Sequence, residues 1–326
     1  MPTTTHAIRI HSVGGPEVMK WEPVEVGNPG PGELRVKHTA VGLNYIDTYH
    51  RTGAYPIPLP FTLGMEGAGV VEAVGANVTG FSVGDRVAYA NPIGSYCEVR
   101  LMPAERAVKI PGGVTDQQAA SMMLKGMTAQ YLLKRTCPVQ PGDTILVHAA
   151  AGGVGLILCQ WGRHLGATVI GTVGDEAKAE LAKAHGAHHT ILYRKEDWVA
   201  KVSEITGGKK CRVVYDGVGK DTFLKSLDCL QPFGLCALYG AASGKPDPLD
   251  TGILAGKGSL YVTRPTLFTY TASRDDLVKS ANDLFDVVSR GIVKINVNQT
   301  YALKDAAQAH ADLESRKTTG STVFTV

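Results

Sequence analysis

The stretch HAAAGGVG, residues 148–155, decides the fold of this chain. A glycine-rich motif is weak evidence alone, but it becomes informative when a strand precedes it, a helix follows it and a second strand comes within about 30 residues. Here TILVH (144–148) is typical of a strand, VGLILCQWGRHLG (154–166) places apolar residues at helical spacing, and TVIGTV (168–173) closes the unit. The sequence therefore predicts a βαβ unit whose glycine loop opens a helix.

The residue types in this loop favour a diphosphate ligand over a purely structural turn. Gly152 and Gly153 permit a tight turn that a diphosphate can approach without meeting a Cβ, and Gly155 lets the helix pack closely on the strand. The helix N-terminus then directs free N–H groups and a partial positive charge at the ligand. We interpret residues 152–155 as a phosphate cradle.

Outward from the loop, the chain changes its pattern near Thr128. Before it, runs with valine at alternate positions and Gly/Pro turns favour antiparallel, barrel-like β structure: ELRVKHTAVG (33–42), GVVEAVG (69–75), GDRVAYA (84–90) and SYCEVRL (95–101). After it, apolar strand candidates alternate with helical patterns, at 144–148, 168–173, 189–192, 212–216, 235–240 and 259–263. This alternation predicts a mostly parallel, doubly wound sheet with the six strands of a dinucleotide-binding domain.

The rest of the chain completes this α/β outline. Residues 176–185 form a helix candidate that closes on Gly186, as a helix C-terminus should. A polar helical pattern covers 275–290, and STVFTV (321–326) is typical of a strand that could return to the first domain.

Composition narrows the function. A chain of 326 residues suggests two domains, and 33 basic against 30 acidic residues gives a net charge of +3, which supports neither a nucleic-acid nor a membrane-surface partner. No apolar run is long enough to span a membrane, and the start MPTTTHAIRI lacks signal-peptide features, so we expect a cytoplasmic protein. The six cysteines form no CxxC pair and read as small buried hydrophobes.

The end of the second strand bears on the choice of dinucleotide. NAD sites usually carry an acidic residue there, about 20 positions past the first glycine, whereas this chain has GTVG (171–174). Asp175 lies further on, inside the turn. Lys178 in the next helix, and Tyr193 and Arg194 after the third strand, could instead meet a 2′-phosphate, although Lys178 could also be a solvated helix lysine. The pattern favours NADPH over NADH.

The order of these parts resembles the zinc-free NADPH:quinone oxidoreductases, the branch of the medium-chain dehydrogenase/reductase superfamily that includes zeta-crystallin, and bacterial members in particular. The matching segments are GLNYIDTYHRTGAYP (42–56), GMEGAGVVEAVG (64–75), VGDRVA (83–88), LKGMTAQYLL (124–133), HAAAGGVG (148–155), GTVGDEAKAELAKAHGA (171–187), VVYDGVG (213–219), GSLYVTRPTL (258–267) and LESRKTTGS (313–321). The resemblance implies a GroES-like catalytic domain over 1–125 and 265–326, a Rossmann NADPH-binding domain over 126–264, and a homodimer.

The resemblance also implies that no zinc takes part. Zinc alcohol dehydrogenases carry a ligand histidine in GHE, where this chain has GME with Met65, and a ligand cysteine near the position of Asn44; a four-cysteine structural loop is missing as well. A thioether and an amide are poor zinc ligands beside imidazole and thiolate. We therefore predict a site without metal.

Carried over position by position, the resemblance implies a set of cofactor contacts. The residues at the nicotinamide end are Asn44, Thr128, Gly240 and Thr266; those at the diphosphate are Gly152, Gly153, Val154 and Gly155; those at the 2′-phosphate are Lys178, Tyr193 and Arg316, with Gly174 in the adjoining turn. Asp175 stands where the resemblance implies a small hydroxyl residue, which weakens the case for the 2′-phosphate without reversing it.

The expected reaction is hydride transfer from NADPH to a quinone, in which the cofactor carries the chemistry and the protein places the reactants. Asn44, Tyr49 and Tyr55 are candidate donors to the quinone oxygen and walls for a flat ring, although both tyrosines could equally pack on the domain edge. Asp47 is better suited to orient its neighbours than to act as an acid.

Two alternatives stay open. The first is an NADPH-dependent reductase of the double bond in enones or alkenals, which needs a proton donor at the α-carbon, a role that Tyr49 or Tyr55 could fill. The second is a non-catalytic, crystallin-like protein that binds nucleotide or RNA, for which the near-neutral charge gives no electrostatic support.

Overall fold

The computed structural model describes residues 3–326, and the chain divides into two compact units. Unit 1 runs to Lys125 and includes Thr271–Phe285 and Ile295–Val326. Unit 2 comprises Gly126–Tyr270 and Asp286–Lys294. The mixed α/β class predicted from the sequence is confirmed, with β-rich structure in unit 1 and a parallel sheet in unit 2.

Unit 1 is built mainly from antiparallel strands. Its strands are β1 (Thr3–Ile10), β2 (Met19–Val26), β3 (Glu33–Leu43), β4 (Phe61–Thr62), β5 (Glu66–Val74), β6 (Arg86–Ala90), β7 (Val99–Pro103), β8 (Val108–Lys109), β15 (Val297–Ala302) and β16 (Ser321–Thr325). They form one sheet in the order β15-β16-β3-β5-β6-β8, with β7 also on β3, and a second in the order β2-β1-β4. The C-terminal strand β16 pairs antiparallel with β3, as the sequence predicts for a returning tail.

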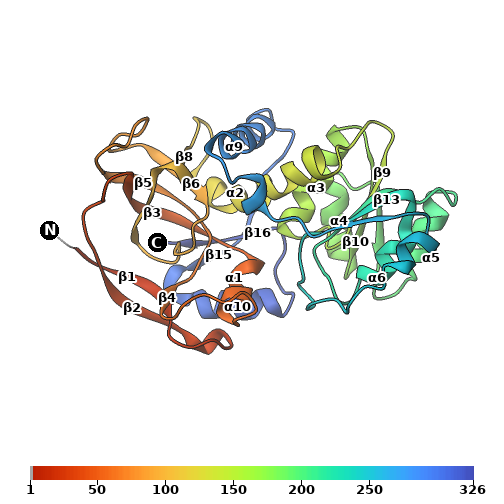
Figure 1. The fold of residues 1–326 in the computed structure, drawn as a ribbon, viewed down its shortest axis with the longest axis horizontal. Coiled ribbons are helices and arrows are strands. Elements are labelled where there is room, and N and C mark those ends of the chain that lie inside the picture. The colour runs from red at the N-terminus through yellow and green to blue at the C-terminus, as the bar shows by residue number, and fades with distance from the viewer. Residues whose placement is uncertain (1–2) are drawn as a thin grey trace. The chain divides into compact units, whose positions relative to one another are not determined.

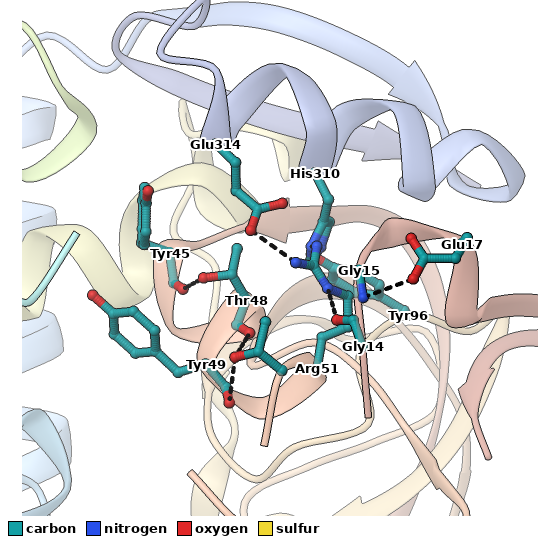
Figure 2. Close-up of polar contacts among 11 residues, drawn as sticks. Gly14, Gly15, Glu17, Tyr45, Thr48, Tyr49, Arg51, Tyr96, His310 and Glu314 are labelled. Carbon is teal, nitrogen blue, oxygen red and sulfur yellow. Dashed lines mark hydrogen bonds and ion pairs between the residues drawn. The ribbon is translucent and has the colours of Figure 1, made fainter. Parts of the chain in front are cut away.

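Helices α1 (Tyr45–Arg51) and α10 (Ala306–Glu314) belong wholly to unit 1, whereas α2 (Asp116–Tyr131) and α9 (Arg274–Ser289) begin in unit 1 and end in unit 2. Helix α1 follows directly on β3, and α10 lies next to α1 in the close-up (Figure 2). Apolar side chains of β1, β3, β16 and α10 form one core, which includes Ile8, Val41, Ala309 and Phe324. Leu43, the last residue of β3, also belongs to this core, so the chain is anchored in unit 1 just before α1 begins.

Unit 2 contains the predicted doubly wound sheet. Its strands are β9 (Thr144–Val147), β10 (Thr168–Val173), β11 (His189–Leu192), β12 (Cys211–Asp216), β13 (Leu230–Leu238) and β14 (Tyr261–Thr263). Each pair is parallel, and the order β11-β10-β9-β12-β13-β14 is the 3-2-1-4-5-6 order of dinucleotide-binding sheets. The central strands β9, β10 and β12 are largely buried, as parallel strands covered on both faces must be.

Helices cover this sheet, as the right part of Figure 1 shows. The helices labelled there are α3 (Gly153–His164), α4 (Glu176–Ala184), α5 (Trp198–Ile205) and α6 (Phe223–Ser226); unit 2 also contains α7 (Gly252–Gly256) and α8 (Leu267–Tyr270). Helix α4 begins after Asp175, whose side chain accepts the Lys178 N–H, and Gly186 follows its end with φ +100°. The predicted start and stop of this helix are therefore confirmed.

One predicted strand is placed differently. The sequence predicts a strand over 95–101, whereas the structure places β7 at Val99–Pro103. The reason is that the preceding backbone pairs elsewhere: Ser95 N–H and Tyr96 N–H donate to the carbonyls of Gly64 and Leu63. This turn buries the Tyr96 side chain completely.

Within residues 3–326, no helix combines the length and apolarity that a membrane crossing requires. The six cysteines are all free; five are buried, and Cys137 is half-buried. The interpretation of cysteines as buried hydrophobes holds for those five.

Candidate functional site

The predicted cradle is a tight loop between β9 and α3. Gly152 N–H donates to the Ala149 carbonyl at 2.8 Å, and Ala149 itself has φ +51°, a left-handed conformation that is uncommon outside glycine. A Cβ built on Gly155 would lie 2.8 Å from the Ala150 Cα and closer still to the Ala149 carbonyl oxygen. Gly155 therefore allows α3 to start against the loop, which turns the N–H groups of the first helical turn outward.

Other predicted cofactor residues follow the carboxyl ends of neighbouring strands. Gly174 follows β10, Tyr193 follows β11, Gly240 comes shortly after β13 and Thr266 shortly after β14. Because parallel strands share one carboxyl edge, these positions lie along the same edge as the cradle. Thr128 is also in unit 2, buried on α2.

A basic and phenolic group surrounds Gly174. A Cβ on Gly174 would lie 3.3 Å from the Tyr193 hydroxyl and 3.6 Å from the Arg194 guanidinium carbon, so both side chains converge on this turn. Lys178 Nζ lies 3.9 Å from the Asp175 carboxylate. The structure thus assembles cations beside the end of β10, with one carboxylate among them.

A buried polar cluster begins at His148, the residue directly before the cradle loop. His148 Nδ1 lies 2.8 Å from the Thr172 hydroxyl and Nε2 lies 3.0 Å from the Ser226 hydroxyl. Ser226 donates to Asp216, which also accepts the backbone N–H groups of Val218 and Gly219. The cluster ties the ends of β9, β10 and β12 together. Neither HAAAGGVG nor VVYDGVG contains a local pattern that indicates the link from His148 through Ser226 to Asp216.

In unit 1, the candidate residues gather at the start of α1. Asn44 Nδ2 donates to the Glu66 carboxylate at 2.8 Å, and Lys125 Nζ lies 3.2 Å from the same Glu66 oxygen. Glu66 is fully buried, and its second oxygen accepts the Leu124 N–H. The buried carboxylate therefore fixes the Asn44 amide, with its charge balanced by Lys125.

Asp47 lies one turn into α1 and is fully buried. Its Oδ2 accepts the Asn44 N–H at 2.9 Å and the Tyr96 hydroxyl at 2.9 Å. Burial raises the pKa of Asp47 to about 7, although both hydrogen bonds and the nearby Lys125 act in the opposite direction. The carboxyl therefore orients Asn44, as the sequence analysis proposed, and it also titrates near neutral pH.

Tyrosines form the exposed side of this region. The rings of Tyr45 and Tyr49 are 5.8 Å apart, and those of Tyr49 and Tyr55 are 5.2 Å apart. Tyr55 is 41% exposed, and its backbone N–H donates to the Tyr49 carbonyl. Figure 2 shows Tyr45 and Tyr49 projecting to the same side of α1. The structure brings Tyr49 and Tyr55 together and adds Tyr45, which directly follows Asn44 at the start of α1.

Arg316 lies in unit 1, exposed just past α10, with φ +61°. Within residues 3–326, no group of three or more His, Cys, Asp or Glu side chains has the arrangement of a metal site. Met65 is buried next to Glu66 in β5.

Comparison with known proteins gives two family matches. The model for the alcohol dehydrogenase GroES-like domain matches residues 30–136, and the model for zinc-binding dehydrogenase matches residues 153–283. Both matches fit the two kinds of structure described above.

Full-length relatives are also found. The chain is 53% identical over 319 residues to the quinone oxidoreductase of Pseudomonas aeruginosa, covering 97% of this chain and 98% of that one. It is 51% identical over 327 residues to the 2-haloacrylate reductase of a Burkholderia species, covering 97% of both chains. A crystal structure of Escherichia coli quinone oxidoreductase complexed with NADPH superposes with a TM-score of 0.96 at 47% identity, over 99% of this chain and 100% of that one.

Proposed function

The chain belongs to the quinone oxidoreductase family of the medium-chain dehydrogenases/reductases, and we propose that it is an NADPH-dependent quinone reductase. The observation that carries the proposal is the cradle at Gly152–Gly155, set between β9 and α3 on a 3-2-1-4-5-6 sheet. This sheet and loop are the parts that a dinucleotide requires.

The residues present fit the cofactor. The first turn of α3 begins at Gly153, so the N–H groups of Gly153, Val154 and Gly155 have no acceptor within the helix and can donate to a diphosphate. Thr128, Gly240 and Thr266 belong to the nicotinamide end in this proposal, and Val154 and Gly153 complete the diphosphate contacts. When bound, NADPH supplies a hydride from its nicotinamide ring.

The 2′-phosphate is assigned to the cations beside β10. Tyr193 and Arg194 converge on Gly174, and Lys178 lies beside Asp175, the next residue in the chain. Two cations with a phenol suit a doubly charged phosphate better than a ribose hydroxyl pair. The assignment of Arg316, a residue of unit 1, to the 2′-phosphate rests on the family resemblance alone.

The chain's own groups then place and polarise the quinone. Asn44, held by Glu66, presents an amide, and Tyr49 and Tyr55 present phenol groups and flat rings. Donors aimed at a quinone oxygen stabilise the negative charge that develops there as hydride arrives at the ring. A quinone is electrophilic enough to react without a metal, so we propose a zinc-independent reaction.

Three further assignments are proposals on the same basis. We assign residues 1–125 and 265–326 to the catalytic domain and 126–264 to the NADPH-binding domain. We propose a homodimer, in support of which β14 ends its sheet and exposes Tyr261 by 60%, beside Phe233 at 70%. The six free cysteines favour a reducing compartment, and we propose a cytoplasmic location.

Steady-state kinetics with 1,4-benzoquinone test the function. We expect NADPH to be oxidised with a lower KM than NADH, at a rate that a chelator leaves unchanged. A rate equal to the non-enzymatic background would contradict the function, and loss of activity with the chelator would contradict zinc independence.

Reduction of an activated carbon–carbon double bond is the second candidate. It is favoured by the 51% identity to a 2-haloacrylate reductase and by the phenol groups of Tyr49 and Tyr55, which can donate the proton that the α-carbon needs. Comparing kcat/KM for 1,4-benzoquinone with that for a 2-alkenal separates the two reactions. The quinone is expected to be the better substrate.

A further inference from the structure

A chain of buried hydrogen bonds links the end of α1 to its start, and the reaction described above makes no use of it. Arg51 Nη1 lies 3.0 Å from His310 Nδ1. The Tyr96 hydroxyl lies 3.1 Å from His310 Nε2 and 2.9 Å from Asp47 Oδ2. All four residues are at most 1% exposed. Figure 2 shows His310 descending from α10 onto Arg51, with Tyr96 behind it.

The hydrogen bonds from Arg51 to Asp47 all run in one donor-to-acceptor direction. A guanidinium only donates, so Arg51 makes His310 Nδ1 an acceptor and leaves the proton on Nε2. That N–H donates to the Tyr96 oxygen, and the Tyr96 hydroxyl then donates to Asp47. Burial lowers the pKa of His310 to about 3, so the ring stays neutral and keeps this tautomer. Every donor therefore points toward Asp47.

Arg51 is itself fixed at the far end. Its Nη2 lies 2.8 Å from the carboxylate of Glu314 on α10, and its Nε donates to the Gly14 carbonyl at 3.1 Å (Figure 2). The Glu314 side chain is 34% exposed. Glu314 and His310 of α10 thus hold the buried guanidinium of Arg51. This cation is linked to Asp47 through the neutral side chains of His310 and Tyr96.

At the receiving end, Asp47 is poised between two protonation states. Its Oδ1 is buried and has no hydrogen-bond partner among the described residues, so a proton has a place there that disturbs neither bond to Oδ2. The charged groups around it are Glu66 on β5, which raises its pKa, and Lys125 on α2, which lowers it. The hydrogen bond that Tyr96 donates also lowers the pKa of Asp47 and so favours the carboxylate.

We propose that Tyr96, His310 and Arg51 are positioning residues that keep Asp47 ionised and thereby hold the first turn of α1, with Asn44 and Tyr49, in its active geometry. A carboxylate accepts the Asn44 N–H more strongly than a carboxylic acid does, so the cap of α1 is firmest when Asp47 is charged. The consequence for turnover depends on the proposed quinone reductase, whereas the effect on Asp47 does not.

The titration of Asp47 in the ligand-free protein provides the first test. Infrared spectroscopy should show one buried carboxylic acid band that disappears with a midpoint of about pH 7 in the wild type and is missing in Asp47→Asn. Tyr96→Phe keeps the ring that packs against Phe324 and removes one donor to the carboxylate, so the midpoint should rise by about one pH unit. His310→Leu should act in the same direction. His310→Gln, which keeps one acceptor and one donor, should restore part of the shift.

Tyr89→Phe is the matched control. Tyr89 is a buried tyrosine of unit 1 whose hydroxyl lies 2.6 Å from His38 Nε2, so the variant loses an equivalent buried hydrogen bond away from Asp47. Its midpoint should equal that of the wild type. An unchanged midpoint in Tyr96→Phe, or an equal shift in Tyr89→Phe, overturns the proposal.

The second test measures turnover. The acid limb of the kcat profile with 1,4-benzoquinone should move to higher pH in Tyr96→Phe by the same amount as the infrared midpoint, with the KM for NADPH unchanged. A profile that does not move overturns the positioning role. Absence of any quinone turnover by the wild type overturns the proposed function alone, because the titration is read without cofactor or substrate.

Discussion

Asp175 and Lys178 lie one turn apart at the start of α4, where Asp175 Oδ1 accepts the Lys178 backbone N–H at 2.9 Å and the other oxygen lies 3.9 Å from Lys178 Nζ. The carboxylate caps the helix, yet it also places a negative charge beside the lysine assigned to the 2′-phosphate. Asp175 therefore opposes the very anion that Lys178 attracts.

Replacing Asp175 with serine should sharpen the preference for NADPH. Serine also caps helices, so α4 is retained while the charge is removed. The side chain is 44% exposed, so the effect is modest: the KM for NADPH should fall about 2- to 5-fold, with the KM for NADH little changed. Asp197→Ser, at the N-cap of α5, is the matched control and should change neither KM. An equal change for both cofactors in Asp175→Ser would show that its charge does not act on the phosphate.

Lys178→Ala should have the opposite effect. Loss of a charged partner of the 2′-phosphate is expected to raise the KM for NADPH about 10-fold or more, and that for NADH less than about 2-fold. The measurement is the ratio of kcat/KM for the two cofactors. Equal effects on both would remove Lys178 from the phosphate site.

Adding one methyl group at Gly155 should disturb both the fold of the cradle and the binding of NADPH. Gly155→Ala places a Cβ against the backbone of Ala149 and Ala150, so the loop and α3 must move apart. We expect a loss of about 1–3 kcal/mol of stability and weak NADPH binding, measured by denaturant unfolding and calorimetric titration. Gly256→Ala, where a Cβ in α7 meets nothing within 4 Å, should leave NADPH binding unchanged and should not lower stability. Normal NADPH affinity in Gly155→Ala would place the cofactor away from this loop.

Asp47 gives a pH-dependent stability with a definite sign. Its pKa rises from 3.8 to about 7 on folding because of burial, so the folded chain holds a proton between these values that the unfolded chain releases. The free energy of unfolding contributed by this group therefore falls as the pH rises toward 7.

Asp47→Asn removes this penalty. Relative to the wild type, the variant should gain stability by up to about 1.4 kcal/mol per pH unit between pH 5 and 7, and no more above pH 8. Burial also lowers the pKa of the histidines His38, His50, His148 and His310, but they change stability in both proteins alike and cancel in the difference. Denaturant unfolding at several pH values measures it, and a difference that does not vary with pH would refute the assigned titration.

The sequence predicts much of unit 2 because its signals are local. The glycine loop, the strands of 3 to 9 residues in its sheet and the end of α4 at Gly186 are each decided by neighbouring residues. Strand order then follows from the handedness and adjacency rules of βαβ units.

The site of unit 1 is less predictable from sequence. Asn44, Asp47 and Tyr49 are close in the chain, and the family resemblance drew attention to them. Tyr96 and His310 are 214 residues apart, and Arg51 and His310 are 259 apart, so no local pattern links them. The alternating pattern over 95–101 predicts a strand that includes Tyr96, because it gives no sign that the backbone turns away to pair with Leu63. Such contacts depend on the packing of α10 against α1.

The most direct test of the central claim is a single-turnover experiment in which enzyme carrying one equivalent of NADPH is mixed rapidly with 1,4-benzoquinone. The account predicts a first-order loss of the nicotinamide absorbance, far faster than the non-enzymatic rate, with hydroquinone formed in equal amount and no change after treatment with a chelator. Loss of NADPH at the non-enzymatic rate would contradict it.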